Sequence, residues 1–284
     1  MKALIILLLA CTVFGVSGYF AYELFIRPQV ELKQERDAPP TPAPPESTLP
    51  EFNKCVTLKR QGKLLEARAA FYDYIDHNPQ STILEQARNE LGELNTRIFL
   101  SPIASPEKGV YIVKSGDVIT RVAQKNKTTP ELIMRANSLS GSMLRIGQKL
   151  LLPPTNFSLL ISRRQNKVIV TNDNRFFKQY NILKWPPQIP PYKKGGPPQA
   201  RQVGKVIEKI AWLDGGRVIF TDKGYERATH WIAISIKHCT LYTEPPANAD
   251  PNKISKPPSG IALSPQATAE LGAMLVRGNP VTLE

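Results

Sequence analysis

The spacing of apolar positions changes several times along the chain, and each change marks a predicted element. Ala3–Tyr22 carries no charge, and a helix of this length, rising about 1.5 Å per residue, spans a hydrocarbon core of about 30 Å. Residues 28–50 follow with no hydrophobic period and many Pro, Glu and Ala. This pattern predicts an N-terminal transmembrane helix within residues 1–27 and a proline-rich linker over residues 28–50.

The first segment leaves three possibilities open. A signal peptide could be cleaved after Val16-Ser17-Gly18, a lipoprotein could carry its lipid on Cys11, or the segment could stay as an uncleaved anchor. The length of the segment favours the anchor. All three carry the rest of the chain out of the cytoplasm. We therefore expect a single-pass inner-membrane protein with its bulk in the periplasm or cell envelope.

Apolar positions next recur every three or four residues, from Leu64 to Ile98, and predict a helical hairpin over residues 51–99. The hairpin resembles a tetratricopeptide repeat at Gly62, Ala67, Phe71 and Pro79. That resemblance implies protein partners, although such repeats usually need at least about three copies. A hairpin packed on a neighbouring domain fits the pattern equally well.

Residues 109–154 change their hydrophobic period twice. Tyr111 and Val113 alternate as in a strand, and Thr129 before Pro130 is typical of a helix start. A second strand leads through Ile146 towards Pro153. The stretch therefore predicts a strand–helix–helix–strand (βααβ) module.

This module resembles a LysM domain over its whole length. The matching positions are Tyr111, Val113, Gly116, Asp117, Ala123, Leu132, Asn137, Leu139, Ile146, Gly147, Gln148, Leu150 and Pro153, while Val118 stands where Thr is usual. The resemblance implies binding of glycans that contain N-acetylglucosamine, chiefly peptidoglycan. It also implies a groove between two loops, formed by Gly116, Asp117, Val118, Ile119, Met143, Leu144, Arg145 and Ile146.

Residues 155–284 alternate mainly with the period of strands. The predicted strands are Phe157–Ser162, Lys167–Thr171, Phe176–Ile182, Arg217–Thr221 and His230–Leu241, followed by a turn, a helix and a final strand. The expected fold class is multidomain α+β: a transmembrane helix, a helical hairpin, the βααβ module and a mainly-β domain.

The mainly-β domain resembles the catalytic domain of L,D-transpeptidases (YkuD-type) at Trp231–Ser235 and Gly260–Leu283. That family cross-links peptidoglycan stem peptides through a cysteine nucleophile. Here Tyr242-Thr243 stands where its His-Gly falls, and Ser259-Gly260-Ile261-Ala262-Leu263 contains neither its Cys nor its Arg. We therefore expect no catalytic residue, with Tyr242, Gly260 and Ile261 as degenerate active-site positions. A divergent L,D-transpeptidase is the enzyme alternative.

Cys239 is the cysteine that could replace the missing nucleophile, because His238 precedes it. Neighbouring side chains of a strand point to opposite faces, so the pair is poorly placed for catalysis. A half-buried structural cysteine is the expectation.

Composition narrows the function further. The chain has 42% hydrophobic residues and three cysteines, which excludes a fully disordered chain and a disulfide scaffold. It has no CxxC pair, so we expect no metal and no cofactor. The formal net charge is +13, and residues 161–237 hold fifteen Lys and Arg against five Asp and Glu. Nucleic acid is not expected as a partner, because the N-terminal segment carries the chain out of the cytoplasm. Carboxylates of peptidoglycan stem peptides or anionic lipids suit the positive charge.

Together these observations predict a membrane-tethered envelope protein that binds peptidoglycan strands through its LysM module. The transpeptidase-like domain is expected to be inactive. A scaffold that binds partner proteins through the helical hairpin is compatible with this prediction.

Overall fold

The computed structural model describes residues 47–192, 200–244 and 259–284. Among these residues, no helix is long and apolar enough to cross a membrane. The predicted transmembrane segment and almost all of the predicted linker lie outside them. Glu46–Glu284 form one compact unit, so the parts described below pack on one another.

Three helices open the described chain: α3 (Leu49–Arg60), α4 (Leu64–His77) and α5 (Leu84–Phe99). Gly62 ends the first helical run with φ of +76°, a conformation that favours glycine. The prediction of a two-helix hairpin is therefore wrong, because this region has three helices. The core that the three helices share is buried and comprises Phe52, Cys55, Leu64, Ala67, Phe71, Tyr74, Ala87, Leu91, Leu94 and Ile98.

The βααβ module has the predicted order. It comprises β1 (Gly109–Ile112), α6 (Ile119–Lys125), α7 (Pro130–Ala136) and β2 (Lys149–Leu152), with the two strands antiparallel. Pro130 begins α7, and the Thr129 side chain accepts a hydrogen bond from Leu132 N at 3.0 Å. The predicted helix start is confirmed.

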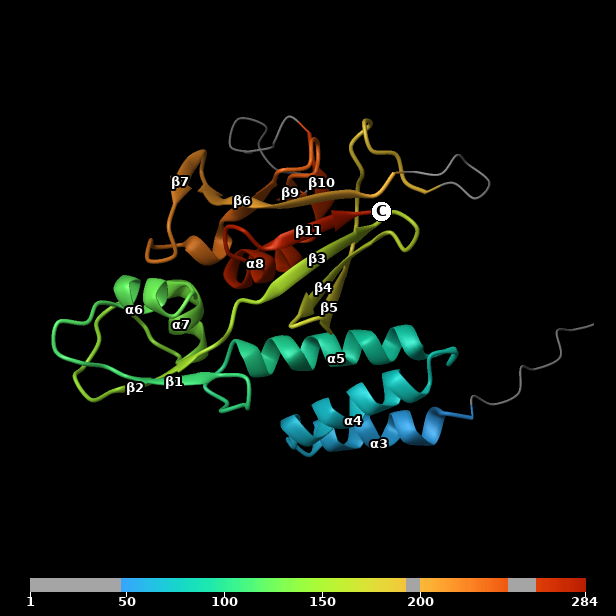
Figure 1. Ribbon diagram of the computed structural model, residues 1–284, viewed down its shortest axis with the longest axis horizontal. Coiled ribbons are helices and arrows are strands. Elements are labelled where there is room, and N and C mark those ends of the chain that lie inside the picture. The colour runs from blue at the N-terminus through green and yellow to red at the C-terminus, as the bar shows by residue number, and fades with distance from the viewer. Residues whose placement is uncertain (1–46, 193–199, 245–258) are drawn as a thin grey trace, which may run out of the picture. The chain divides into compact units, whose positions relative to one another are not determined.

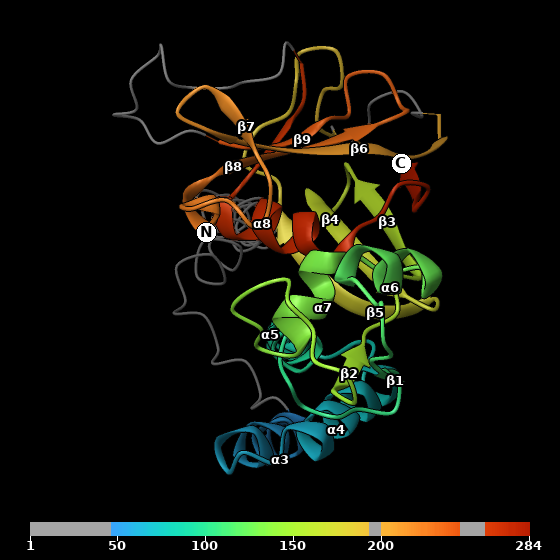
Figure 2. The ribbon, with the colours of Figure 1, turned by 90° about the vertical axis from the view of Figure 1, so that its left-hand side faces the viewer.

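The remaining elements form a nine-stranded sheet with one helix. They are β3 (Phe157–Ser162), β4 (Lys167–Asn172), β5 (Arg175–Asn181), β6 (Gln202–Leu213), β7 (Gly216–Val218), the short 3-10 helix η2 (Tyr225–Arg227), β8 (Thr229–Ile234), β9 (Leu241–Thr243), β10 (Ile261–Leu263), α8 (Pro265–Met274) and β11 (Pro280–Leu283). The strand order is β10-β9-β8-β6-β11-β3-β4-β5, and β7 pairs with β6. Figure 2 shows α8 beside β8, against which it packs.

Three parts of the strand prediction need correction. The predicted strand Arg217–Thr221 ends at Val218. The long strand β6 is absent from the predicted set, because its register shifts between Val206 and Glu208 and interrupts the alternation of buried and exposed residues. The predicted strand His230–Leu241 ends at Ile234, and the chain turns with His238 at a φ of +64° before β9.

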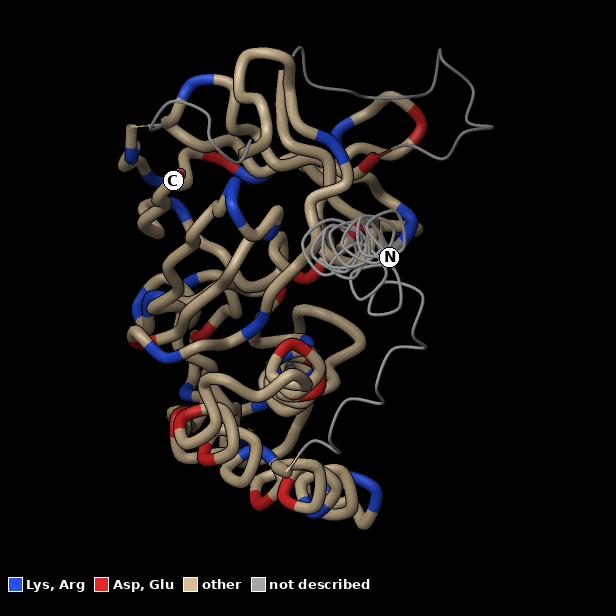
Figure 3. Tube along the Cα trace, turned by 90° about the vertical axis from the view of Figure 1, so that its right-hand side faces the viewer, with Lys and Arg blue, Asp and Glu red and all other residues tan. Residues whose placement is uncertain are grey.

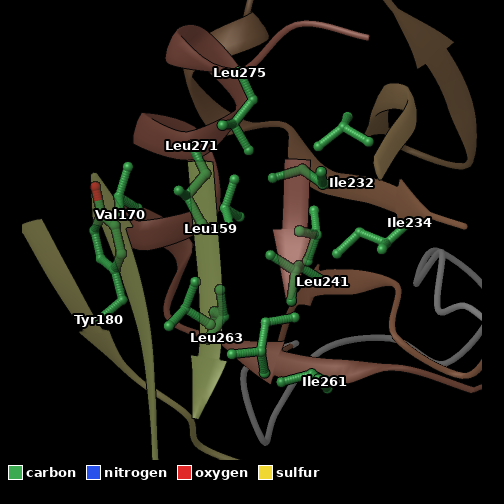
Figure 4. Packing of buried hydrophobic residues seen from close by; sticks show 14 of the residues in the cluster. Leu159, Val170, Tyr180, Ile232, Ile234, Leu241, Ile261, Leu263, Leu271 and Leu275 are labelled. Atoms are coloured by element: carbon green, nitrogen blue, oxygen red, sulfur yellow. The ribbon is translucent and has the colours of Figure 1, made fainter. Parts of the chain in front are cut away.

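The apolar core of the sheet also includes residues from the three-helix region and from the βααβ module. Leu159, Ile232, Leu241 and Leu271 converge in it (Figure 4). The same cluster contains Phe99 from α5 and Leu132 from α7. The three-helix region and the βααβ module are therefore built onto the sheet and share its core.

Helix α5 packs against the edge strand β5 (Figure 1), and both polar groups and aromatic rings join the two. Lys178 Nζ lies 2.8 Å from Glu93 Oε1 and 2.7 Å from Glu270 Oε2. Gln179 Nε2 donates to Asn89 Oδ1 at 2.7 Å. Acidic and basic positions are mixed on the three helices, whereas basic positions predominate over the sheet (Figure 3). The helical region is thus packed on a neighbouring domain, one of the two arrangements that its sequence allowed.

Candidate functional site: the loops of the βααβ module

The first loop of the module is organised by one carboxylate. Gly116 has a φ of +82°, and the next residue turns its side chain back over the loop. Asp117 Oδ2 accepts hydrogen bonds from Lys114 N at 2.7 Å and from Tyr111 OH at 2.8 Å. The bond from the Lys114 amide, followed by the bond from Tyr111, lowers the pKa of Asp117. An ionised Asp117 therefore fixes the loop.

The second loop is tied to the end of the first strand. Val113 N donates to Gln148 O and Gly147 N donates to Val113 O, both at 2.9 Å. Gln148 Oε1 also accepts from Arg145 N at 3.1 Å. These bonds place the start of the first loop beside the end of the second loop.

Two apolar side chains of the second loop are unusually exposed. Met143 is 88% exposed and Ile146 is 74% exposed. They line a hollow of about 660 Å³ together with Leu139, Ser140, Gly141, Arg145, Gly147 and Gln148. Exposed apolar side chains in a hollow suit the methyl group of an acetamido sugar.

The eight predicted groove residues fall into different positions. Met143, Arg145 and Ile146 line the hollow, and Leu144 packs partly against the module's core. Gly116, Asp117 and Val118 lie at the surface of the first loop and do not line it. Ile119 is buried in the core, so its side chain does not face the loops.

Five residues that line the hollow were not among the predicted ones. They are Leu139, Ser140, Gly141, Gly147 and Gln148. The Ser-Leu-Ser-Gly-Ser run at 138–142 is the signal that could have identified the first three, since such runs form loops.

The predicted degenerate positions lie in packed surroundings. Tyr242, Gly260 and Ile261 are all buried. A Cβ atom at Gly260 would lie only 2.3 Å from Thr240 O, so no side chain fits there without a backbone shift. Burial, followed by the neighbouring Glu244 carboxylate, raises the pKa of Tyr242 to about 12.

Cys239 is fully buried, more so than the expected half-buried cysteine. Burial raises the pKa of its thiol to about 11, with Arg163 acting weakly in the opposite direction. The neighbouring His238 bonds elsewhere: its Nδ1 lies 3.1 Å from Ser259 Oγ, which donates to Gln188 Oε1. A thiol with this pKa carries almost no thiolate at neutral pH, and the thiolate is the reactive form.

In the described part of the chain, no group of three or more His, Cys, Asp or Glu side chains is arranged to hold a metal ion.

A comparison with known protein families supports the prediction made for the βααβ module. The LysM domain family matches residues 111–153. No curated protein matches the chain in sequence.

Among solved structures, the chain is similar to L,D-transpeptidases. An L,D-transpeptidase from Mycobacterium smegmatis is 12% identical, with a TM-score of 0.30 over 49% of this chain and 64% of that one. One from Stackebrandtia nassauensis is 14% identical, with a TM-score of 0.29 over 45% of this chain and 55% of that one. This chain thus spans less than two thirds of either. A mutant L,D-transpeptidase from Enterococcus faecium is 13% identical, with a TM-score of 0.29 over 68% and 82%.

Proposed function

We propose that this protein binds peptidoglycan glycan strands in the cell envelope through the hollow beside Met143 and Ile146. The observation that carries the proposal is the LysM match over residues 111–153, whose second loop exposes these two side chains. The loop bonds described above hold the hollow open before any ligand arrives. A preformed site of this kind loses little conformational entropy on binding.

The sheet domain, in this proposal, contributes no covalent chemistry. Acyl transfer through cysteine needs an accessible thiolate, a base beside it and donors for the oxyanion. Cys239 is buried with a raised pKa, and His238 bonds Ser259 instead. The domain then acts as a platform to which the LysM module is fixed.

The N-terminal segment Ala3–Tyr22 completes the proposal as a tether that keeps the module near the wall. One shallow groove binds weakly, and tethering raises the effective concentration of the module at its ligand.

Purified sacculi test the binding. We expect the full chain, in detergent, to sediment with sacculi and with glycan strands from which an amidase has removed the stem peptides. Equal recovery with and without the glycan would overturn the proposal. Membrane tethering is tested separately: alkaline carbonate extraction should leave the protein in the membrane fraction, and release into the soluble fraction would refute the tether.

A further inference from the structure

Strand β5 contains a bulge that two helices hold in place. The pairing of β4 with β5 shifts between Val170 and Thr171, which leaves Phe177 without a partner across the ladder. Tyr72 OH donates to Phe176 O, and Asn95 Nδ2 donates to Phe177 O, each at 2.8 Å. The carbonyls around the bulge are therefore satisfied by α4 and α5. Bulges of this kind often lie beside functional sites.

A cavity of about 430 Å³ lies beside this bulge. Its walls come from α4, α5, the segment before β1 and the β4–β5 turn. The volume falls in the range of small-molecule sites, roughly 300–1,000 Å³, and such sites are common where parts of a fold meet.

The charges around the cavity are not equally available to a ligand. Arg68 makes a bidentate ion pair with Glu107, so these two groups neutralise each other. The Arg175 guanidinium stacks over the Tyr72 ring, 3.6 Å from its centroid, and Arg175 lines the cavity. Arginine held in this way is prepared to bind a carboxylate.

The acceptor for a positive group lies in the β4–β5 turn itself. Asn172 lines the cavity beside this turn, but its Oδ1 is buried and not open to a ligand. Asp173 also lines the cavity, with one carboxylate oxygen accepting from Asn156 at 2.9 Å and the other left over. Asp173 and Asn174 have φ of +49° and +63°, as in a type I′ turn, so the turn is tightly constrained.

We propose that this cavity binds a short zwitterionic peptide, with its carboxylate on Arg175 and its ammonium on the Asp173 carboxylate. The stem peptide of peptidoglycan carries both groups, and naming it as the source rests on the proposed function. A peptide site here and a glycan site on the LysM module would engage two parts of one polymer.

Titration calorimetry of the full chain in detergent with a synthetic stem tetrapeptide tests this proposal. The matched probe is the same peptide N-acetylated and fully amidated, which carries neither charge. We expect only the free peptide to bind, and Arg175→Gln to weaken it about tenfold or more, as loss of a charge-assisted bond requires. Arg164→Gln, at an exposed position outside the cavity, should leave the affinity unchanged.

Absence of binding by the free peptide at millimolar concentration would overturn the proposal. So would equal binding of the capped peptide, or an unchanged affinity of Arg175→Gln. A chain that binds peptide-free glycan but no free peptide retains the proposed function and refutes this site. The reverse result refutes the glycan function and leaves the peptide site standing.

Discussion

Asn137 and Leu151 exchange two hydrogen bonds through one side chain. Asn137 Nδ2 donates to Leu151 O at 2.8 Å, and Leu151 N donates to Asn137 Oδ1 at 2.7 Å. The amide thereby completes the edge of β2 and fixes the end of α7 against it. This pairing sets the two anchor points of the loop that carries Met143 and Ile146.

Replacing this amide should destabilise the module. Asn137→Leu keeps the size of the side chain but leaves two backbone groups of Leu151 unpaired, and we expect a loss of about 2–3 kcal/mol. Urea unfolding, monitored by hydrogen exchange of the module's backbone amides, measures this loss of stability. Asn126→Leu is the control, since Asn126 makes a single local bond to Val122 O. Equal losses in the two variants would contradict the role of Asn137.

His230 should make the fold sensitive to acid. Its side chain is 5% exposed, and burial, followed by the charges of Arg135 and Lys209, lowers its pKa from 6.5 to about 4. Between these values the unfolded chain binds the proton and the folded chain does not. The free energy of unfolding therefore falls as the pH drops through this window, by up to about 3 kcal/mol.

Urea unfolding between pH 4 and 7 measures this slope. His230→Gln should flatten it, whereas His77→Gln, at an exposed position, should keep it. An unchanged slope in His230→Gln would show that another group carries the acid sensitivity.

The two ion pairs of Lys178 should differ in their contribution to the free energy of unfolding. The Glu93 side chain is 56% exposed, while that of Glu270 is 13% exposed and also accepts from Tyr180 OH at 2.9 Å. Glu270→Gln leaves a buried ammonium poorly compensated, which costs about 3 kcal/mol. Glu93→Gln breaks a solvent-screened pair and costs at most about 1 kcal/mol. Thermal unfolding compares the two, and the reverse order would contradict the structure.

Cys239 should be unreactive in the folded protein. Burial and a pKa of about 11 leave little accessible thiolate. We expect no alkylation of this residue by iodoacetamide at pH 8, and complete alkylation in urea, by peptide mass spectrometry. A covalent carbapenem adduct on Cys239 would instead support the transpeptidase alternative.

The sequence predicted elements best where local periodicity decides them. Phe157–Ser162 has its predicted bounds because buried and half-buried residues alternate over its first five positions. The strand around Ile207 was missed because a bulge there reverses the alternation. The turn at His238 depends on a left-handed backbone that no period reveals.

The candidate glycan-binding residues were predictable to a similar extent. Met143 and Ile146 stand out as apolar residues in a loop, and the structure exposes both. Ile119, in contrast, is apolar beside a loop but turns into the core. Contacts between distant segments, such as Asn95 with Phe177 O, join residues far apart in the chain. Local patterns therefore give no signal for the cavity beside β5.

The most direct test of glycan binding compares two double variants of the LysM module. Met143→Ser with Ile146→Ser removes the apolar lining of the hollow, while Val110→Ser with Ile112→Ser removes two exposed apolar side chains from β1. Sedimentation with peptide-free glycan strands measures retention. We predict that the first variant loses at least about tenfold in affinity, as expected for roughly 1.4 kcal/mol of lost apolar contact, and that the second binds as the unaltered chain does. Equal retention of both variants would contradict the assignment of this hollow as the glycan site.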